Sequence, residues 1–194
     1  MKKLRRAFFI SIIAMGSFYY WGFFGYCADK TRQDYYEDGT LKSSYPYNES
    51  GLLDGLAREY YPNGKIKVEA EYNNNVKEGT YKKYYENGNL IVLANYKDGK
   101  KDGILKRYYT SGSLMLEQSY LDGERDGPYK WYYRNEALKE EGTYEHDKKD
   151  GMCKRYFSTG LLKAERLYKD GRLISKTCYD EQGNAAECFD KQIK

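Results

Sequence analysis

The segment from Thr80 to Gly103, TYKKYYENGNLIVLANYKDGKKDG, decides the fold because the chain repeats it with a period of 24 residues. The following units are ILKRYYTSGSLMLEQSYLDGERDG, PYKWYYRNEALKEEGTYEHDKKDG and MCKRYFSTGLLKAERLYKDGRLIS, and LAREYYPNGKIKVEAEYNNNVKEG precedes them. Three sets of residues keep this spacing: Tyr60, Tyr84, Tyr108, Tyr132 and Tyr156; Ile66, Leu90, Leu114, Leu138 and Leu162; and Tyr72, Tyr96, Tyr120, Tyr144 and Tyr168. A period held this closely indicates a repeat architecture.

Each unit has the pattern of a β-hairpin. Pairs such as Asn87-Gly88 separate two runs rich in tyrosine and aliphatic residues. We expect a two-residue type I′ turn there, since that turn needs positive φ at both central residues and favours Asn-Gly. This register places Tyr85 opposite Leu90. The same register places Lys83 opposite Val92 and Tyr81 opposite Ala94. The fourth unit has Asn135-Glu136 at this position, which predicts a strained turn or a turn of another type.

On one face of each hairpin, a basic residue of the first strand is expected to lie opposite an acidic residue of the second strand. Position 82 is basic in all five units, and position 93 is acidic in four of them, Leu93 being the exception. We expect cross-strand ion pairs worth about 0.2–1 kcal/mol each, which favour one register more than they add stability. Five glycines recur where a strand should begin, and we expect them to tolerate no bulk because an aromatic ring packs over bare backbone there. They are Gly55, Gly79, Gly103, Gly127 and Gly151.

The beginning of the chain predicts export. Four basic residues precede an uncharged, apolar run from Ala7 to Ala28, as in a secretory signal peptide. The run is also about long enough to span a bilayer as an uncleaved anchor. We therefore assign residues 1–28 to a signal peptide or anchor helix, and residues 29–194 to one repeat domain in the periplasm, in the cell envelope or outside the cell. The domain has about six repeats and a C-terminal half-repeat.

The charge of the chain argues against nucleic acid as a partner. The sequence has 33 Lys and Arg against 29 Asp and Glu, and the excess equals the four basic residues of the leader. The exported part is therefore formally neutral and has no net charge to attract a polyanion. The same neutrality disfavours anionic lipid, so we expect contact with the membrane only through the N-terminal segment.

Residues that could support catalysis or hold a metal are few. His146 is the only histidine and lies in a polar turn, so we expect a surface residue. The repeated Asp-Gly pairs lack the dense acidic spacing of a calcium loop. We expect no catalytic residue, no metal and no cofactor. Cys178 and Cys188 flank the last turn; in a two-residue loop they point to opposite faces, whereas a three-residue loop brings them to one face, and either outcome is open.

The recurring pattern YYxNGxLxxxxxYxDGxxDG resembles the MORN repeat (membrane occupation and recognition nexus) in its bacterial variant form, over about residues 35 to 175. The resemblance implies hairpins side by side in an elongated, twisted antiparallel sheet, the fold that the periodicity also predicts. We expect an all-β rod of about 13 strands, near 60 Å long at about 4.8 Å per strand. Related proteins are variously labelled antitoxin-like or kinase-like, but the resemblance itself implies a binding or scaffolding module.

Two classes of function follow. The first is a non-catalytic scaffold that binds another protein; the second is a module for glycan or cell-wall polymer, and an antitoxin-like partner or membrane lipid ranks behind both. A single-layer sheet leaves one aromatic face uncovered, and such faces often bind partners. We expect the binding face to include Tyr85, Tyr109, Trp131, Tyr133, Tyr96 and Tyr120. The alternative is the charged face with Lys82, Lys106, Lys130, Glu117 and Glu141.

Overall fold

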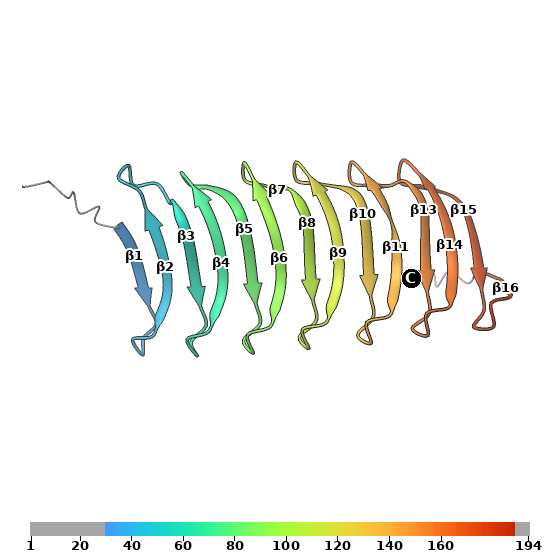
Figure 1. Cartoon of the computed structure of the whole chain (residues 1–194), viewed down its shortest axis with the longest axis horizontal. Helices are drawn as coiled ribbons and strands as arrows, with labels where there is room; N and C mark the ends of the chain where they lie inside the picture. The colour runs from blue at the N-terminus through green and yellow to red at the C-terminus, as the bar shows by residue number, and fades with distance from the viewer. Residues whose placement is uncertain (1–29, 189–194) are drawn as a thin grey trace, which may run out of the picture.

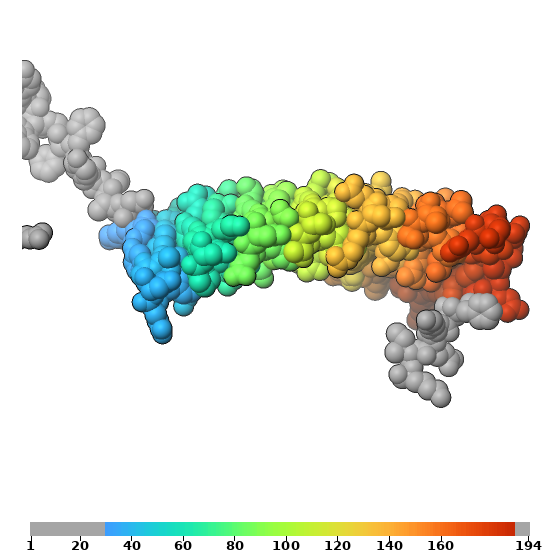
Figure 2. All heavy atoms as spheres, turned by 90° about the horizontal axis from the view of Figure 1, so that it is seen from below, coloured from blue at the N-terminus to red at the C-terminus, as the bar shows by residue number. Residues whose placement is uncertain are grey.

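The computed structural model describes residues 30–188, which form one open antiparallel sheet. Figure 1 shows the strands side by side in chain order, and Figure 2 shows the resulting rod. The predicted leader helix lies outside the described residues. Within them, no helix is long and apolar enough to cross a membrane.

The sheet has 16 strands, two of which, β7 and β12, are short pieces that lie off the main path. The first strands are β1 (Lys30–Tyr35), β2 (Leu41–Tyr47), β3 (Gly55–Tyr60), β4 (Ile66–Asn73), β5 (Val76–Tyr84), β6 (Leu90–Lys97), β7 (Lys100–Lys101) and β8 (Gly103–Tyr108). They are followed by β9 (Leu114–Leu121), β10 (Glu124–Tyr132), β11 (Leu138–Glu145), β12 (Lys148–Lys149), β13 (Gly151–Tyr156), β14 (Leu162–Lys169), β15 (Arg172–Tyr179) and β16 (Ala185–Ala186). The predicted all-β antiparallel architecture is confirmed, with more strands than the expected 13 or so, partly because β7 and β12 are short separate pieces.

The hairpin register agrees with the prediction in the strands and differs at the turn. Lys83 pairs with Val92 and Tyr81 with Ala94, as expected, but Tyr84 and not Tyr85 lies opposite Leu90. The backbone N–H of Gly88 donates to the oxygen of Tyr85 at 2.9 Å, and only the glycine has positive φ, +97°. This is a three-residue loop, a type I turn followed by a left-handed residue, so the expected two-residue type I′ turn is wrong.

Type I′ turns do occur, but they connect the strands at their other ends, on the opposite long side of the rod. There both central residues have positive φ, as in Asp98 (+49°) and Gly99 (+77°). The pairs Asp98-Gly99, Asp122-Gly123 and Asp170-Gly171 therefore make two-residue turns, whereas the Asn-Gly pairs make three-residue loops. In the fourth repeat Glu136 occupies the glycine position with φ +65°, so the turn type is kept, and the expected strain comes from a side chain in the left-handed region.

The last turn uses the same three-residue loop, in which the N–H of Gly183 donates to the oxygen of Asp180. Cys178 lies opposite Ala186, so Cys188 two residues later returns to the same face. The two cysteines form a disulfide with 5.4 Å between their Cα atoms. Of the two alternatives for this pair, the three-residue loop is the one that the structure contains. Cys153 is buried and is not part of a disulfide.

Burial is concentrated on one face of the sheet, along a row that crosses the strands. Ala94, Leu105 and Leu116 form its central cluster, and Val92, Tyr96, Tyr120 and Trp131 pack against them. The other buried apolar residues are Ala57, Ala70, Tyr129, Cys153 and Ala164. With no second layer above the sheet, small residues are buried only where long side chains of neighbouring rows lie across them. We call this side of the sheet the core face, and the other side the charged face.

The backbone conformation explains why glycine recurs at these five positions. All have positive φ, between +83° and +101°. An added Cβ at Gly103 would meet nothing closer than 3.9 Å, and none of the five has an aromatic atom among its nearest neighbours. The expected reason, an aromatic ring over bare backbone, is therefore wrong for these residues. It holds at Gly142 instead, where a Cβ would lie 3.0 Å from the ring of the fully buried Tyr129.

Candidate interaction surface

The tyrosine that directly precedes each three-residue loop connects its repeat to the next one. The Tyr85 hydroxyl donates to the backbone oxygen of Tyr108 at 3.1 Å, and that of Tyr109 donates to the oxygen of Tyr132 at 2.8 Å. Tyr133 makes the same bond to Tyr156 at 2.9 Å, and Tyr36 and Tyr61 extend the series toward the N-terminus. These phenols form a hydrogen-bond ladder along the loop edge of the rod.

The ladder changes the interpretation of three predicted site residues. Tyr85, Tyr109 and Tyr133 each begin a loop, and the Lys139 ammonium lies 5.4 Å from the centre of the Tyr133 ring. The expected pairing of Tyr85 with Leu90 is wrong, because the loop begins one residue earlier than the two-residue turn would require.

The other three predicted residues, Tyr96, Tyr120 and Trp131, lie together on the core face. All three border the Ala94, Leu105 and Leu116 cluster and are half-buried. Trp131 pairs with Leu116 across the strands and packs against the core cluster. Its role in binding stays a prediction.

Basic residues alternate with the third set of tyrosines on the same face. Lys77 lies opposite Tyr72, Lys101 opposite Tyr96, Arg125 opposite Tyr120 and Lys149 opposite Tyr144. Each cation also reaches the ring of the next repeat: the distance to the ring centre is 5.3 Å from Lys77 to Tyr96 and 4.9 Å from Lys101 to Tyr120. Such contacts attract a cation to the face of the ring. We call the row the tyrosine–cation stripe; it consists of Tyr72, Lys77, Tyr96, Lys101, Tyr120, Arg125, Tyr144, Lys149 and Tyr168.

The carboxylates near this stripe are unevenly distributed. The Arg125 Nε donates to Asp147 Oδ1 at 2.7 Å, and the Lys149 ammonium lies 2.7 Å from Glu140 Oε1. Among the described residues, Lys77 and Lys101 have no carboxylate within ion-pair distance. The C-terminal half of the stripe is therefore internally neutralised, whereas its N-terminal half is not.

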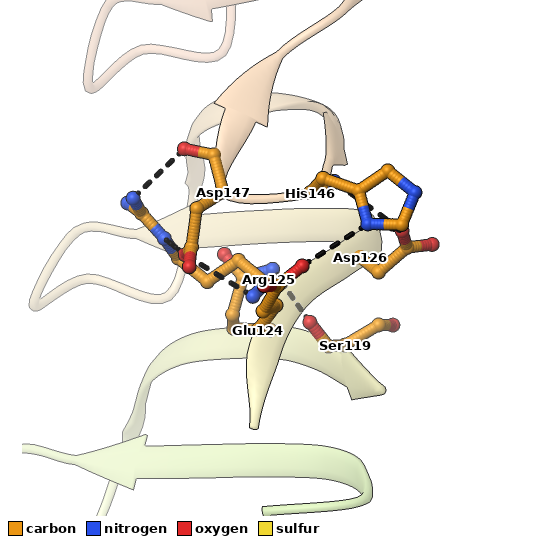
Figure 3. A network of polar contacts seen from close by, with 7 residues as sticks. Ser119, Glu124, Arg125, Asp126, His146 and Asp147 are labelled. Carbon is orange, nitrogen blue, oxygen red and sulfur yellow. Dashed lines mark hydrogen bonds and ion pairs between the residues drawn. The ribbon is translucent and has the colours of Figure 1, made fainter. Parts of the chain in front are cut away.

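Figure 3 shows how the turns of neighbouring repeats hold Arg125 and its surroundings. Arg125 also donates to the backbone oxygen of Asp147 at 3.0 Å, and His146 Nδ1 lies 3.0 Å from Glu124 Oε2. The contact with Glu124, together with the charge of Asp126, raises the pKa of His146 above its usual value. The His146 side chain is 75% exposed, so the expected surface position is confirmed.

A hollow of about 390 Å³ lies on the core face beside the N-terminal half of the stripe. Its walls carry Lys77, Lys83, Lys101 and Arg107, with the rings of Tyr96 and Tyr120 between them. Ala94, Leu105 and Leu116 form its floor. We call it the cationic groove.

Three of the four predicted cross-strand ion pairs form on the charged face of the described residues; the fourth, between Lys130 and Glu141, does not, although the two residues lie opposite each other. Arg58 lies 3.1 Å from Glu69, Lys106 lies 3.0 Å from Glu117, and Lys154 lies 3.7 Å from Glu165. Tyrosine hydroxyls add to them. Tyr84 donates to Glu69 at 2.9 Å, and burial together with this contact raises the pKa of Tyr84 to about 12. This face neutralises its own charges, which distinguishes it from the cationic groove.

The sequence reasoning missed the stripe cations although their period is visible, since Lys77, Lys101, Arg125 and Lys149 are 24 residues apart. The formal neutrality of residues 29–194 is a sum over many residues, and such a sum cannot show that one face carries an excess of cations. Comparison with known families gives one match. The family model described as "MORN repeat variant" matches residues 28–49, 53–74, 77–98, 101–122 and 125–146. No curated protein matches the chain.

Proposed function

Because the chain belongs to the MORN repeat variant family, whose repeats are interaction modules, we propose that it is a non-catalytic, exported scaffold that binds another protein in the cell envelope or outside the cell. The observation that carries this proposal is the open core face. The aromatic rings and cations of the cationic groove are half-buried or exposed, and the single-layer sheet provides no second layer to cover them. Accessible patches with tyrosine, tryptophan and arginine are typical of protein-binding surfaces.

Export is proposed from the basic and apolar leader and from the neutral composition of the rest. The disulfide between Cys178 and Cys188 supports it, since disulfides persist in oxidising compartments and are rare in the cytosol. Fractionation of cells that express the full-length protein with a C-terminal tag tests this part. Recovery of most of the protein from the cytosol with its cysteines reduced would contradict it.

Chemical crosslinking in the same cells, followed by capture of the tagged full-length protein, tests the scaffold. A partner that is captured by the wild-type chain and lost when groove residues such as Arg107 are replaced supports the proposal. Because Trp131 forms part of the core cluster, Trp131→Ala needs a melting curve beside the binding measurement. Capture of no protein at all, with the chain folded and exported, would contradict the proposal.

The second candidate is binding of glycan or cell-wall polymer. The rings of Tyr96 and Tyr120 in the cationic groove favour it, because flat aromatic surfaces can stack on sugar rings. Co-sedimentation of the full-length protein with purified wall polymer distinguishes the two candidates. Sedimentation that persists when Arg107 is replaced by Gln but is lost when Tyr96 is replaced by Ala would favour the glycan.

A further inference from the structure

The cationic groove has a strong imbalance of charge. Four of its lining residues are basic, namely Lys77, Lys83, Lys101 and Arg107, and none is Asp or Glu. Among the described residues, none of these four cations has a carboxylate within ion-pair distance. On the other side of β8, by contrast, Lys106 has a partner in Glu117. The groove therefore complements an anionic ligand.

The spacing of the cations points to a particular kind of anion. Equivalent positions of neighbouring repeats are two strands apart, so Lys77 is about 9.6 Å from Lys101 along the rod, given about 4.8 Å between strands, and Lys83 is as far from Arg107. A polyproline II helix advances about 9.3 Å in three residues. A polypeptide in this conformation that runs across the strands would present every third side chain to successive repeats.

The aromatic rings support the same conformation. Tyr96 and Tyr120 stand between the cations of the cationic groove, and grooves lined with aromatic residues are the usual docking sites for polyproline II segments. A nucleic acid strand fits less well, because its phosphates follow one another at about 3.4 Å per strand, and a cation every 9.6 Å or so would leave most of them without a partner.

We propose that the cationic groove binds an extended acidic polypeptide in the polyproline II conformation, lying along the rod with a carboxylate at every third residue. The carboxylates contact the basic residues, and the residues between them pack on the tyrosine rings. This inference rests on the proposed function, since it names the chemistry of the protein partner.

The test uses the folded full-length protein and a fluorescein-labelled peptide of repeated Glu-Pro-Pro triplets, long enough to span three repeats. A second peptide of the same composition has its glutamates in one block. Fluorescence anisotropy at low and at physiological salt gives the two dissociation constants. We expect the triplet peptide to bind more tightly than the block peptide, with an affinity that falls as salt is added.

A matched pair of double variants identifies the surface. Replacing Lys101 and Arg107 by Gln removes two cations from the groove, and replacing Lys100 and Lys106 by Gln removes two neighbouring cations from the other side of the same strands. Both variants have the same net charge. We expect the first to weaken binding of the triplet peptide at least about tenfold, since two charge-assisted contacts are lost. The second should change it by less than about twofold.

Three outcomes would overturn the inference. They are equal affinity for the two peptides, no measurable binding of either peptide, and equal loss of binding in the two double variants with unchanged melting temperatures. Tighter binding of an acidic polysaccharide or a single-stranded oligonucleotide than of the triplet peptide would assign the groove to that class instead. A captured cellular partner whose binding is unaffected by the Lys101 and Arg107 replacements would leave the scaffold function intact and refute the groove as its site.

Discussion

Removal of one hydroxyl group from the tyrosine ladder tests how the repeats are joined. In Tyr109→Phe the ring is kept, and the chain itself has a phenylalanine, Phe157, at the equivalent position of a later repeat. The change removes the 2.8 Å hydrogen bond from Tyr109 to the backbone oxygen of Tyr132, which is partly buried. The net loss should be about 0.5–1.5 kcal/mol of unfolding free energy. For a domain of this size that corresponds to a decrease of roughly 2–4 °C in melting temperature per kcal/mol.

The matched control is Tyr120→Phe. It makes the same chemical change in the same repeat, at a phenol that has no hydrogen bond to another described residue. Thermal denaturation followed by circular dichroism, with urea unfolding for the free energies, measures both variants. The ladder variant should lose stability and the control should lose little. Equal melting temperatures for the two variants would show that the ladder contributes nothing, and equal losses would show that the effect comes from the ring.

Three further predictions concern the backbone and one exposed histidine. Glu136→Gly should raise the unfolding free energy by about 1 kcal/mol, because Glu136 has φ +65°, a conformation that glycine adopts without steric cost. Urea unfolding measures this change. Gly103→Val should lower the unfolding free energy by about 1–3 kcal/mol, since Gly103 has φ +89°, whereas Lys100→Val at the exposed turn serves as the control. The pKa of His146 should exceed 6.5 in an NMR titration, and Glu124→Gln should lower it. Because the folded pKa is raised, the stabilising contact with Glu124 is present below pH 6.5 and is lost as pH rises through the folded value.

Each of these predictions can fail clearly. A less stable Glu136→Gly variant would show that the side chain compensates for its backbone strain. If Gly103→Val and Lys100→Val lower the melting temperature equally, the positive φ of the glycine has no special cost. A His146 titration that ignores the Glu124 replacement would mean that the two side chains do not interact in solution.

The sequence by itself determined the architecture of the hairpins. The strict period identified the repeats, and the alternation of residues from Leu90 to Tyr96 placed the correct side chains opposite Lys83 and Tyr81. It also predicted the ion pairs of the charged face, of which Arg58 with Glu69 is one. These features follow from local rules, because side chains on a strand alternate between the two faces. The register shift between Lys83 and Tyr84 offsets the longer loop, so the pairs farther from the turn are those that a two-residue turn would give.

The type of each turn was harder to predict from the sequence. Asn-Gly and Asp-Gly pairs both favour positive φ, so the chemistry of either pair is compatible with a type I′ turn. The packing of neighbouring hairpins decides at which end of the strands the two-residue turn lies. The structure gives it to Asp98-Gly99 and gives the Asn87-Gly88 pair the longer loop, from which Tyr85 can reach the next repeat.

Only the tertiary structure decided how charge and aromatic rings are distributed in space. Contacts between repeats join residues far apart in the chain, such as Lys101 and Tyr120 over the core cluster. A formally neutral composition therefore folded into one face that neutralises its own charges and another that holds unpaired cations. Net charge is a sum over the chain, whereas recognition depends on the local field at a surface, and that field exists only once the hairpins are stacked side by side.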